Sequence, residues 1–129
     1  MPNSILVVED SEDTQEFFKA TLEAEGFNVL EARDGHQALE LLRRRSDLVL
    51  IMLDLSMPGM TGLEFLEAME KQNLGQGIPV MVVSAASNMS SLPLPSNVID
   101  TLKKPFFYPE LVYKIRKVHG LTPDTQPRP

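Results

Sequence analysis

The stretch Leu48-Val49-Leu50-Ile51-Met52-Leu53-Asp54 is the most informative part of this sequence. Its first six residues are all apolar, with no alternation, and the run stops abruptly at an acidic residue. Strands of a parallel sheet are covered by helices on both faces, so they carry continuous apolar runs. The stretch therefore predicts a central strand over residues 48–53, with Asp54 at its carboxyl end.

Shorter apolar runs on either side of this stretch predict four more strands, at residues 5–8, 27–30, 79–83 and 98–102. Amphipathic stretches separate them and predict helices over 11–25, 34–42 and 61–69 and from 109 onward. Repeated strand–helix alternation is typical of an α/β fold, here a doubly wound five-stranded parallel sheet. Because its crossovers are right-handed, all strands end at one edge, where such folds bind ligands.

The interval between residues 85 and 97 departs from this alternation, although a helix is expected there. Pro93 and Pro95 would each remove a helical hydrogen bond and clash with the preceding turn, at about 3 kcal/mol apiece. We therefore predict a shortened or irregular fourth helix that ends by about Leu92.

Length and composition predict a single domain. The chain has 129 residues, 43% of them hydrophobic, and we expect the domain to cover residues 1–121. Residues 122–129 hold three prolines and are expected to be a disordered tail or the start of a linker. The absence of cysteine excludes a disulfide framework and a thiol nucleophile.

The charge balance and the lack of long apolar runs bear on partners and location. Twelve basic against 18 acidic residues give a net charge of −6, which argues against direct nucleic-acid binding. No apolar run approaches the roughly 18–20 residues that a membrane span needs. The N-terminus also lacks the basic region of a secretory signal. We expect a cytoplasmic protein with no membrane partner.

Polar residues follow the predicted strands at the edge where ligands bind: Glu9 and Asp10, then Asp54, Ser84 and Lys104. Two carboxylates about 5 Å apart repel by about 3 kcal/mol at an effective dielectric constant of about 20. Three carboxylates and one ammonium group leave a net charge of −2, which a divalent cation would balance. The hard oxygen donors favour Mg²⁺, or Mn²⁺, over zinc.

These residues resemble the pattern of a bacterial response-regulator receiver domain of the CheY-like superfamily. The resemblance covers residues 4–120 and rests on Glu9-Asp10, Asp54 followed by Pro58-Gly59, Ser84-Ala85 and Lys104-Pro105. It implies the strand order 2-1-3-4-5 and a cis Lys104–Pro105 bond. It also implies that Asp54 is the phosphorylated residue.

The same resemblance assigns roles to the other residues at the strand ends. Mg²⁺ would be held by Glu9, Asp10, Asp54 and the backbone carbonyl of Ser56. The hydroxyl of Ser84 would bond the phosphoryl group, and the ammonium of Lys104 would pair with it. Residue chemistry agrees, because a carboxylate can attack phosphorus while cations neutralise its oxygens.

The resulting prediction is a phosphoryl-accepting switch in a two-component phosphorelay. A sensor histidine kinase or a histidine phosphotransfer protein would donate the phosphoryl group. A downstream protein, or an output domain beyond residue 129, would receive the signal. The chain would not be an enzyme, beyond catalysing its own phosphorylation and dephosphorylation.

Switching would involve Ser84 and Thr101. The family commonly has an aromatic residue at the position of Thr101, so this position and the two prolines depart from its pattern. The main alternative is a pseudo-receiver, which binds partners without phosphorylation. A haloacid-dehalogenase-type phosphatase would need a second aspartate where Ser56 stands, and a flavodoxin-like carrier would need a phosphate loop after Val8.

Overall fold

A five-stranded parallel sheet with the order β2-β1-β3-β4-β5 forms the centre of the molecule. The computed structural model describes residues 3–57, 59–85 and 94–117. The strands are β1 (Ser4–Val8), β2 (Asn28–Ala32), β3 (Leu48–Asp54), β4 (Val80–Ser84) and β5 (Val98–Lys103). The predicted strand order and the central position of the 48–54 run are therefore confirmed.

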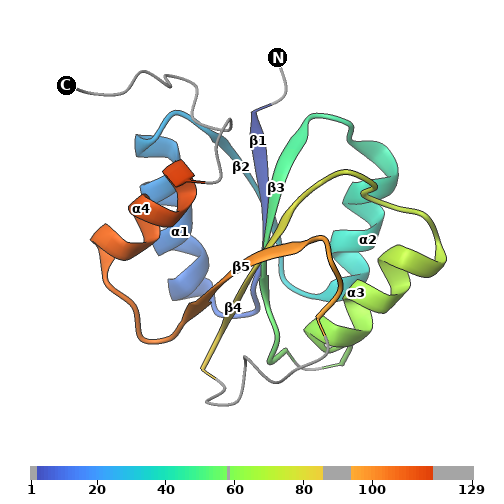
Figure 1. Ribbon diagram of the computed structural model, residues 1–129. Helices are drawn as coiled ribbons and strands as arrows, with labels where there is room; N and C mark the ends of the chain where they lie inside the picture. The colour runs from blue at the N-terminus through green and yellow to red at the C-terminus, as the bar shows by residue number, and fades with distance from the viewer. Residues whose placement is uncertain (1–2, 58, 86–93, 118–129) are drawn as a thin grey trace.

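Helices cover both faces of the sheet (Figure 1). The described residues form α1 (Glu12–Ala24), α2 (Gly35–Arg44), α3 (Gly62–Lys71) and α4 (Tyr108–Lys117). Helices α1 and α4 lie on one side of the sheet, and α2 and α3 lie on the other (Figure 1). Most of the fourth helix predicted between residues 85 and 92 lies outside the described residues, as do Pro93 and the predicted tail.

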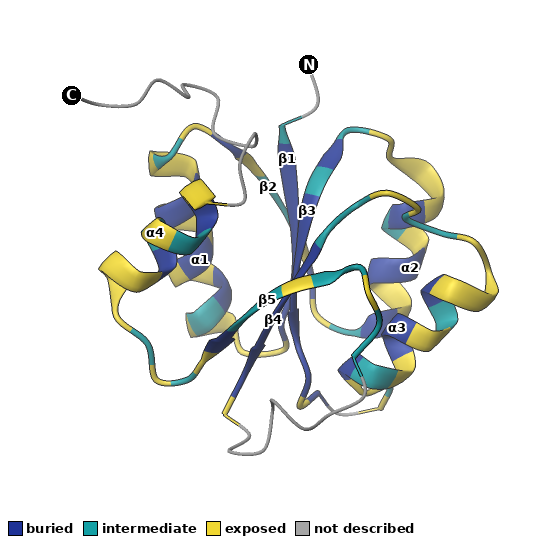
Figure 2. Ribbon diagram, viewed as in Figure 1, coloured by how far each residue is buried: buried dark blue, intermediate teal, exposed yellow. Residues whose placement is uncertain are grey.

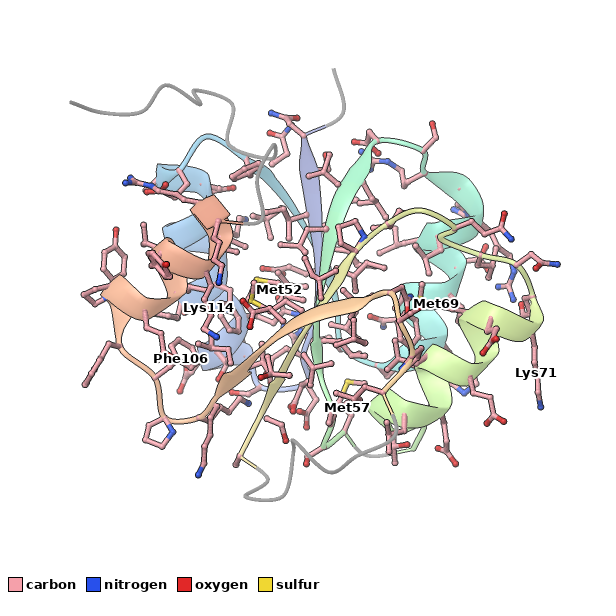
Figure 3. All side chains as sticks on the ribbon, in the orientation of Figure 1. Met52, Met57, Met69, Lys71, Phe106 and Lys114 are labelled. Carbon is pink, nitrogen blue, oxygen red and sulfur yellow. The ribbon has the colours of Figure 1, made fainter. Side chains whose placement is uncertain are left out.

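Alternating residues of the inner strands belong to two separate hydrophobic clusters, one on each face of the sheet. Leu6 and Val8 of β1 pack against α2 and α3, whereas Ile5 and Val7 pack against α1 and α4. Burial is concentrated in the central strands and the inner helix faces (Figure 2). Met52 belongs to the cluster beside α1 and α4, while Met57 and Met69 belong to the opposite cluster (Figure 3).

Local signals set several helix ends. Ser11 caps α1, and the Thr61 side chain forms a reciprocal capping box with Glu64 at α3. Gly26 follows α1 with φ of 95°, a left-handed conformation that glycine adopts at little cost. These three ends were predictable from residue type and spacing alone.

The buried face of α1 is narrower than its residue pattern indicates. Helical spacing would put Phe17, Phe18, Thr21, Leu22 and Ala24 on one side of the helix, but Phe17 and Ala24 are exposed. Gln15 takes a buried place on this face instead. At about 100° per residue, Phe17 and Ala24 both point more than about 100° away from the centre of the stripe formed by the buried residues of α1.

Among the described residues, no helix combines the length and the apolar character needed to cross a membrane.

Candidate functional site

The polar residues predicted at the strand ends do meet at one edge of the sheet. Glu9 and Asp10 directly follow β1, Asp54 is the last residue of β3, and Ser84 is the last residue of β4. Lys104 directly follows β5, and its backbone N–H donates to the Ser84 carbonyl over 2.9 Å. The ends of β3, β4 and β5 therefore each contribute one charged or polar residue to this edge of the sheet, and the end of β1 contributes two.

Three carboxyl groups form the centre of the site. One oxygen from each of Glu9, Asp10 and Asp54 can be chosen so that all lie within 4.8 Å of one another. Glu9 and Asp54 are buried, at 2% and 5% exposed, whereas Asp10 is open to solvent. The site therefore concentrates negative charge at a pocket that remains accessible from one side.

The ammonium group of Lys104 lies between two of these carboxylates. Its Nζ is 3.1 Å from Oε1 of Glu9 and 3.6 Å from Oδ2 of Asp54. Lys104 precedes Pro105, and the peptide bond between them is cis, as expected from the resemblance. Lys104 therefore places a positive charge between Glu9 and Asp54.

The backbone around Asp54 orients its carboxylate. Oδ1 accepts a hydrogen bond from the Ser56 backbone N–H over 3.0 Å, while Oδ2 faces Lys104. The start of α3 approaches this segment closely, because a Cβ on Gly62 would lie 2.8 Å from the Asp54 carbonyl oxygen. Glycine at position 62 therefore allows α3 to pack directly behind the aspartate.

The surroundings of Glu9 shift the pKa of its carboxyl group in opposite directions. Burial raises the pKa of its carboxyl group, the backbone N–H of Ser11 lowers it, the charge of Asp54 raises it and Lys104 lowers it. The net direction is upward from 4.5, because desolvation outweighs the favourable partners. The negative charge of Glu9 is thus costly even beside Lys104, and a further cation would offset that cost.

The donor set fits Mg²⁺. All the available side-chain ligands are carboxylate oxygens, which are the hard donors that Mg²⁺ prefers. With Lys104 included, the charged groups of the pocket sum to −2, the charge that a divalent ion neutralises.

Comparison with known proteins agrees with this geometry. The model of the response regulator receiver domain family matches residues 5–116. The chain belongs to this family. Receiver domains act in two-component regulatory systems and bind Mg²⁺ at an acidic pocket.

Curated relatives of this chain include longer transcriptional regulators. The transcriptional regulatory protein CpxR of Escherichia coli is 39% identical over 117 residues, which cover 90% of this chain and 49% of CpxR. The chain thus spans about half the length of such relatives.

Two solved structures illustrate the likeness of the fold. A CheY-like receiver from Methanospirillum hungatei is 26% identical, with a TM-score of 0.81 over 95% of this chain and 98% of that one. The response regulator TrrA of Thermotoga maritima, solved with Mg²⁺ and BeF, is 29% identical. Its TM-score is 0.78 over 89% of this chain and 97% of TrrA.

The two residues predicted to switch this receiver lie at different depths. Ser84 is fully buried at the carboxyl end of β4. Thr101 lies within β5, paired in register with Val82, and its carbonyl accepts a hydrogen bond of 2.7 Å from Lys114 Nζ. Figure 3 shows Lys114 between α4 and the sheet. Thr101 is half-buried and lies two residues before the end of β5.

An apolar hollow adjoins the receiver's acidic pocket. It is open to solvent, has a volume of about 500 Å³, and its lining includes Phe17, Ala85, Lys104 and Phe106. The ring of Phe106 stacks on that of Phe18, which fixes this wall of the hollow. The hollow gives the site open space beside Lys104.

Sequence reasoning missed Gln15 and Gly62 as parts of this site. Gln15 stands in the polar first turns of α1, where nothing distinguishes it from its exposed neighbours. Gly62 lies between Thr61 and Glu64, which form the capping box of α3, so its sequence context indicates only the start of a helix. A glycine at the first position of a helix, where propensity disfavours it, was the signal that a close approach occurs there.

Proposed function

We propose that this receiver accepts a phosphoryl group on Asp54 in a Mg²⁺-dependent reaction and thereby switches its interactions. The observation that supports this most strongly is the surroundings of one buried carboxylate. Asp54 ends the central strand, faces Lys104 Nζ at 3.6 Å and shares a pocket with Glu9 and Asp10. A nucleophile, a fixed positive charge and a set of metal ligands are what phosphoryl transfer requires.

Glu9, Asp10 and Asp54 would hold the metal ion, together with the backbone carbonyl of Ser56. The ion would neutralise charge on the phosphoryl oxygens during transfer. Mn²⁺ satisfies the same oxygen donor set.

Side chains of this protein would carry out the phosphoryl transfer itself. An oxygen of Asp54 attacks phosphorus, forming a P–O bond as the P–N bond of a phosphohistidine breaks. The imidazole nitrogen leaves with the electron pair and takes up a proton. Lys104 pairs with the transferred group, and the hydroxyl of Ser84 donates a hydrogen bond to it. The apolar hollow beside Ala85 and Lys104 leaves room for the donor.

The proposed donor is a sensor histidine kinase or a histidine phosphotransfer protein. The output would pass to a downstream protein or to an output domain beyond residue 129, through movement of Ser84 and a response at Thr101. The chain would not act on a separate substrate, and it would catalyse only its own phosphorylation and dephosphorylation.

The test compares two matched substitutions, Asp54→Asn and Asp34→Asn. Asp34 caps α2, and asparagine is an equally good capping residue, so this control should keep its fold. Each protein is incubated with Mg²⁺ and acetyl phosphate, and intact mass is measured.

We expect one added phosphoryl group on the wild type and on Asp34→Asn, and none on Asp54→Asn or after chelation of Mg²⁺. Equal labelling of Asp54→Asn would contradict the proposal. An unlabelled wild type would contradict it as well, and would favour a pseudo-receiver.

A further inference from the structure

Gln15 is a buried amide that contacts the backbone at the carboxyl ends of β1 and β2. Its side chain is 1% exposed. Its Nε2 lies 3.0 Å from the Val7 carbonyl oxygen, 3.0 Å from that of Glu9 and 2.9 Å from that of Ala32. One nitrogen thus serves three carbonyls at the point where the chain leaves β1 for the acidic pocket.

The orientation of this amide follows from its partners. Nε2 carries two protons, which three carbonyl oxygens share, whereas Oε1 is buried and has no hydrogen-bond partner among the described residues. A flipped amide would place Oε1 against three oxygens, so this orientation is the favourable one. The chain tolerates a buried, unsatisfied oxygen here, which is costly. Packing alone does not explain a polar residue at this place.

The hydrogen bonds hold the backbone of Glu9 on both sides. Its N–H donates to the Ala32 carbonyl over 3.0 Å, and its own carbonyl accepts from Gln15. The Glu9 side chain is then held by the Ser11 N–H at 3.1 Å and by Lys104 at 3.1 Å. The position of the Glu9 carboxylate within the acidic cluster therefore depends on a backbone segment that Gln15 ties to β2.

We propose that Gln15 is a positioning residue for the Mg²⁺ pocket. It acts through the backbone of Glu9 and keeps the carboxylates of Glu9 and Asp10 beside Asp54. This inference rests on the proposed function, since it assumes that these carboxylates hold the metal. Groups that orient metal ligands commonly change metal affinity by about 10–100-fold when they are removed.

The test uses Gln15→Met, which keeps the length of the side chain and removes its amide. Thr21→Val is the matched control, because Thr21 is buried on the same face of α1, about 9 Å further along the helix. Mg²⁺ is titrated into each protein and its Kd is read from backbone amide chemical shifts. The rate of labelling by acetyl phosphate is then measured against Mg²⁺ concentration.

We expect Gln15→Met to raise the Kd for Mg²⁺ by about tenfold, with the labelling rate at saturating Mg²⁺ close to that of the wild type. Thr21→Val should leave this Kd unchanged even if it lowers stability. A Kd for Gln15→Met within about twofold of the wild-type value would overturn the inference, because a purely structural role predicts that result. If the wild-type protein is not labelled, the proposed function is contradicted instead. The comparison of Kd values for Mg²⁺ would still test the role of Gln15 in that case.

The wild-type chain provides a second measurement if Gln15→Met does not fold. The side-chain NH₂ signals of Gln15 should shift during the Mg²⁺ titration with the same midpoint as the backbone amides of Glu9 and Asp10. Signals that stay unchanged while those amides shift would overturn the inference.

Discussion

Replacing Lys104 by methionine should destabilise the metal-free chain. The ammonium lies 3.1 Å from the Glu9 carboxylate and 3.6 Å from that of Asp54. At an effective dielectric constant of about 20, each attraction is worth about 5 kcal/mol before desolvation is counted. Removing one partner of a buried pair costs about 3–5 kcal/mol, because the other charge stays buried and unpaired. Lys104 is 26% exposed, so we expect a smaller loss, about 2 kcal/mol in the free energy of unfolding.

The loss should depend on Mg²⁺ and on pH. Without Lys104 the pocket has three negative charges and no positive one, so added Mg²⁺ should stabilise the variant more than the wild type. Lys104 lowers the pKa of Glu9, and its removal raises that pKa further. A group with a raised folded-state pKa binds protons more tightly in the native state, so stability falls as pH rises through that pKa. The penalty should therefore shrink in acid, as Glu9 becomes protonated.

Urea unfolding with and without Mg²⁺, at several pH values, measures these effects. Lys103→Met is the matched control, since Lys103 is an exposed neighbour on β5 and its replacement should change stability by no more than about 0.5 kcal/mol. Adding Glu9→Gln to Lys104→Met should restore much of the lost stability, because it removes one unpaired charge. A Lys104→Met protein as stable as the control, or one that gains no more from Mg²⁺ than the wild type, would refute this reasoning.

Three further substitutions test other parts of the structure. Glu9→Gln alone should raise the stability of the metal-free chain near neutral pH, because burial raises the pKa of Glu9. The same substitution should weaken Mg²⁺ binding about tenfold. Urea unfolding checks the first effect and Mg²⁺ titration the second. Asp47→Asn should lower the free energy of unfolding by about 1 kcal/mol at pH 7. The hydrogen-bonded ion pair with Arg45 holds the pKa of Asp47 at about 2, and solvent screens this pair. The loss of stability should therefore vanish as pH falls towards 2. Gly62→Ala should lower the free energy of unfolding by about 2 kcal/mol and slow the labelling of Asp54, because the alanine Cβ would lie 2.7 Å from the Leu55 Cα. Unchanged stability in that variant would show that α3 need not approach so closely.

The sequence predicts the fold and the main site because buried strands and their ends leave clear local signals. The run from Leu48 to Leu53 is apolar throughout and has to be covered on both faces. Asp54 stands where that run stops, and parallel topology places it with the residues that follow the other strands. These inferences depend only on where apolar runs end.

Edge strands and helix faces were harder to predict, for physical reasons. Strand β2 covers Asn28–Ala32 rather than 27–30, because an edge strand exposes residues such as Glu31 that interrupt its apolar pattern. The role of Gln15 depends on carbonyls from two strands far apart in sequence, which no local pattern reveals. The closer pairing of Lys104 with Glu9 than with Asp54 likewise depends on side-chain reach in three dimensions.

The central claim is that Asp54 itself receives the phosphoryl group, and chemical trapping of the product tests it most directly. The chain is labelled with acetyl phosphate and Mg²⁺, reduced with borohydride, and digested for peptide sequencing by mass spectrometry. Reduction converts an aspartyl phosphate to homoserine, so we predict homoserine at position 54 alone, and only when Mg²⁺ was present. Homoserine at another aspartate, or an unmodified Asp54 in protein that has gained a phosphoryl group, would contradict the account.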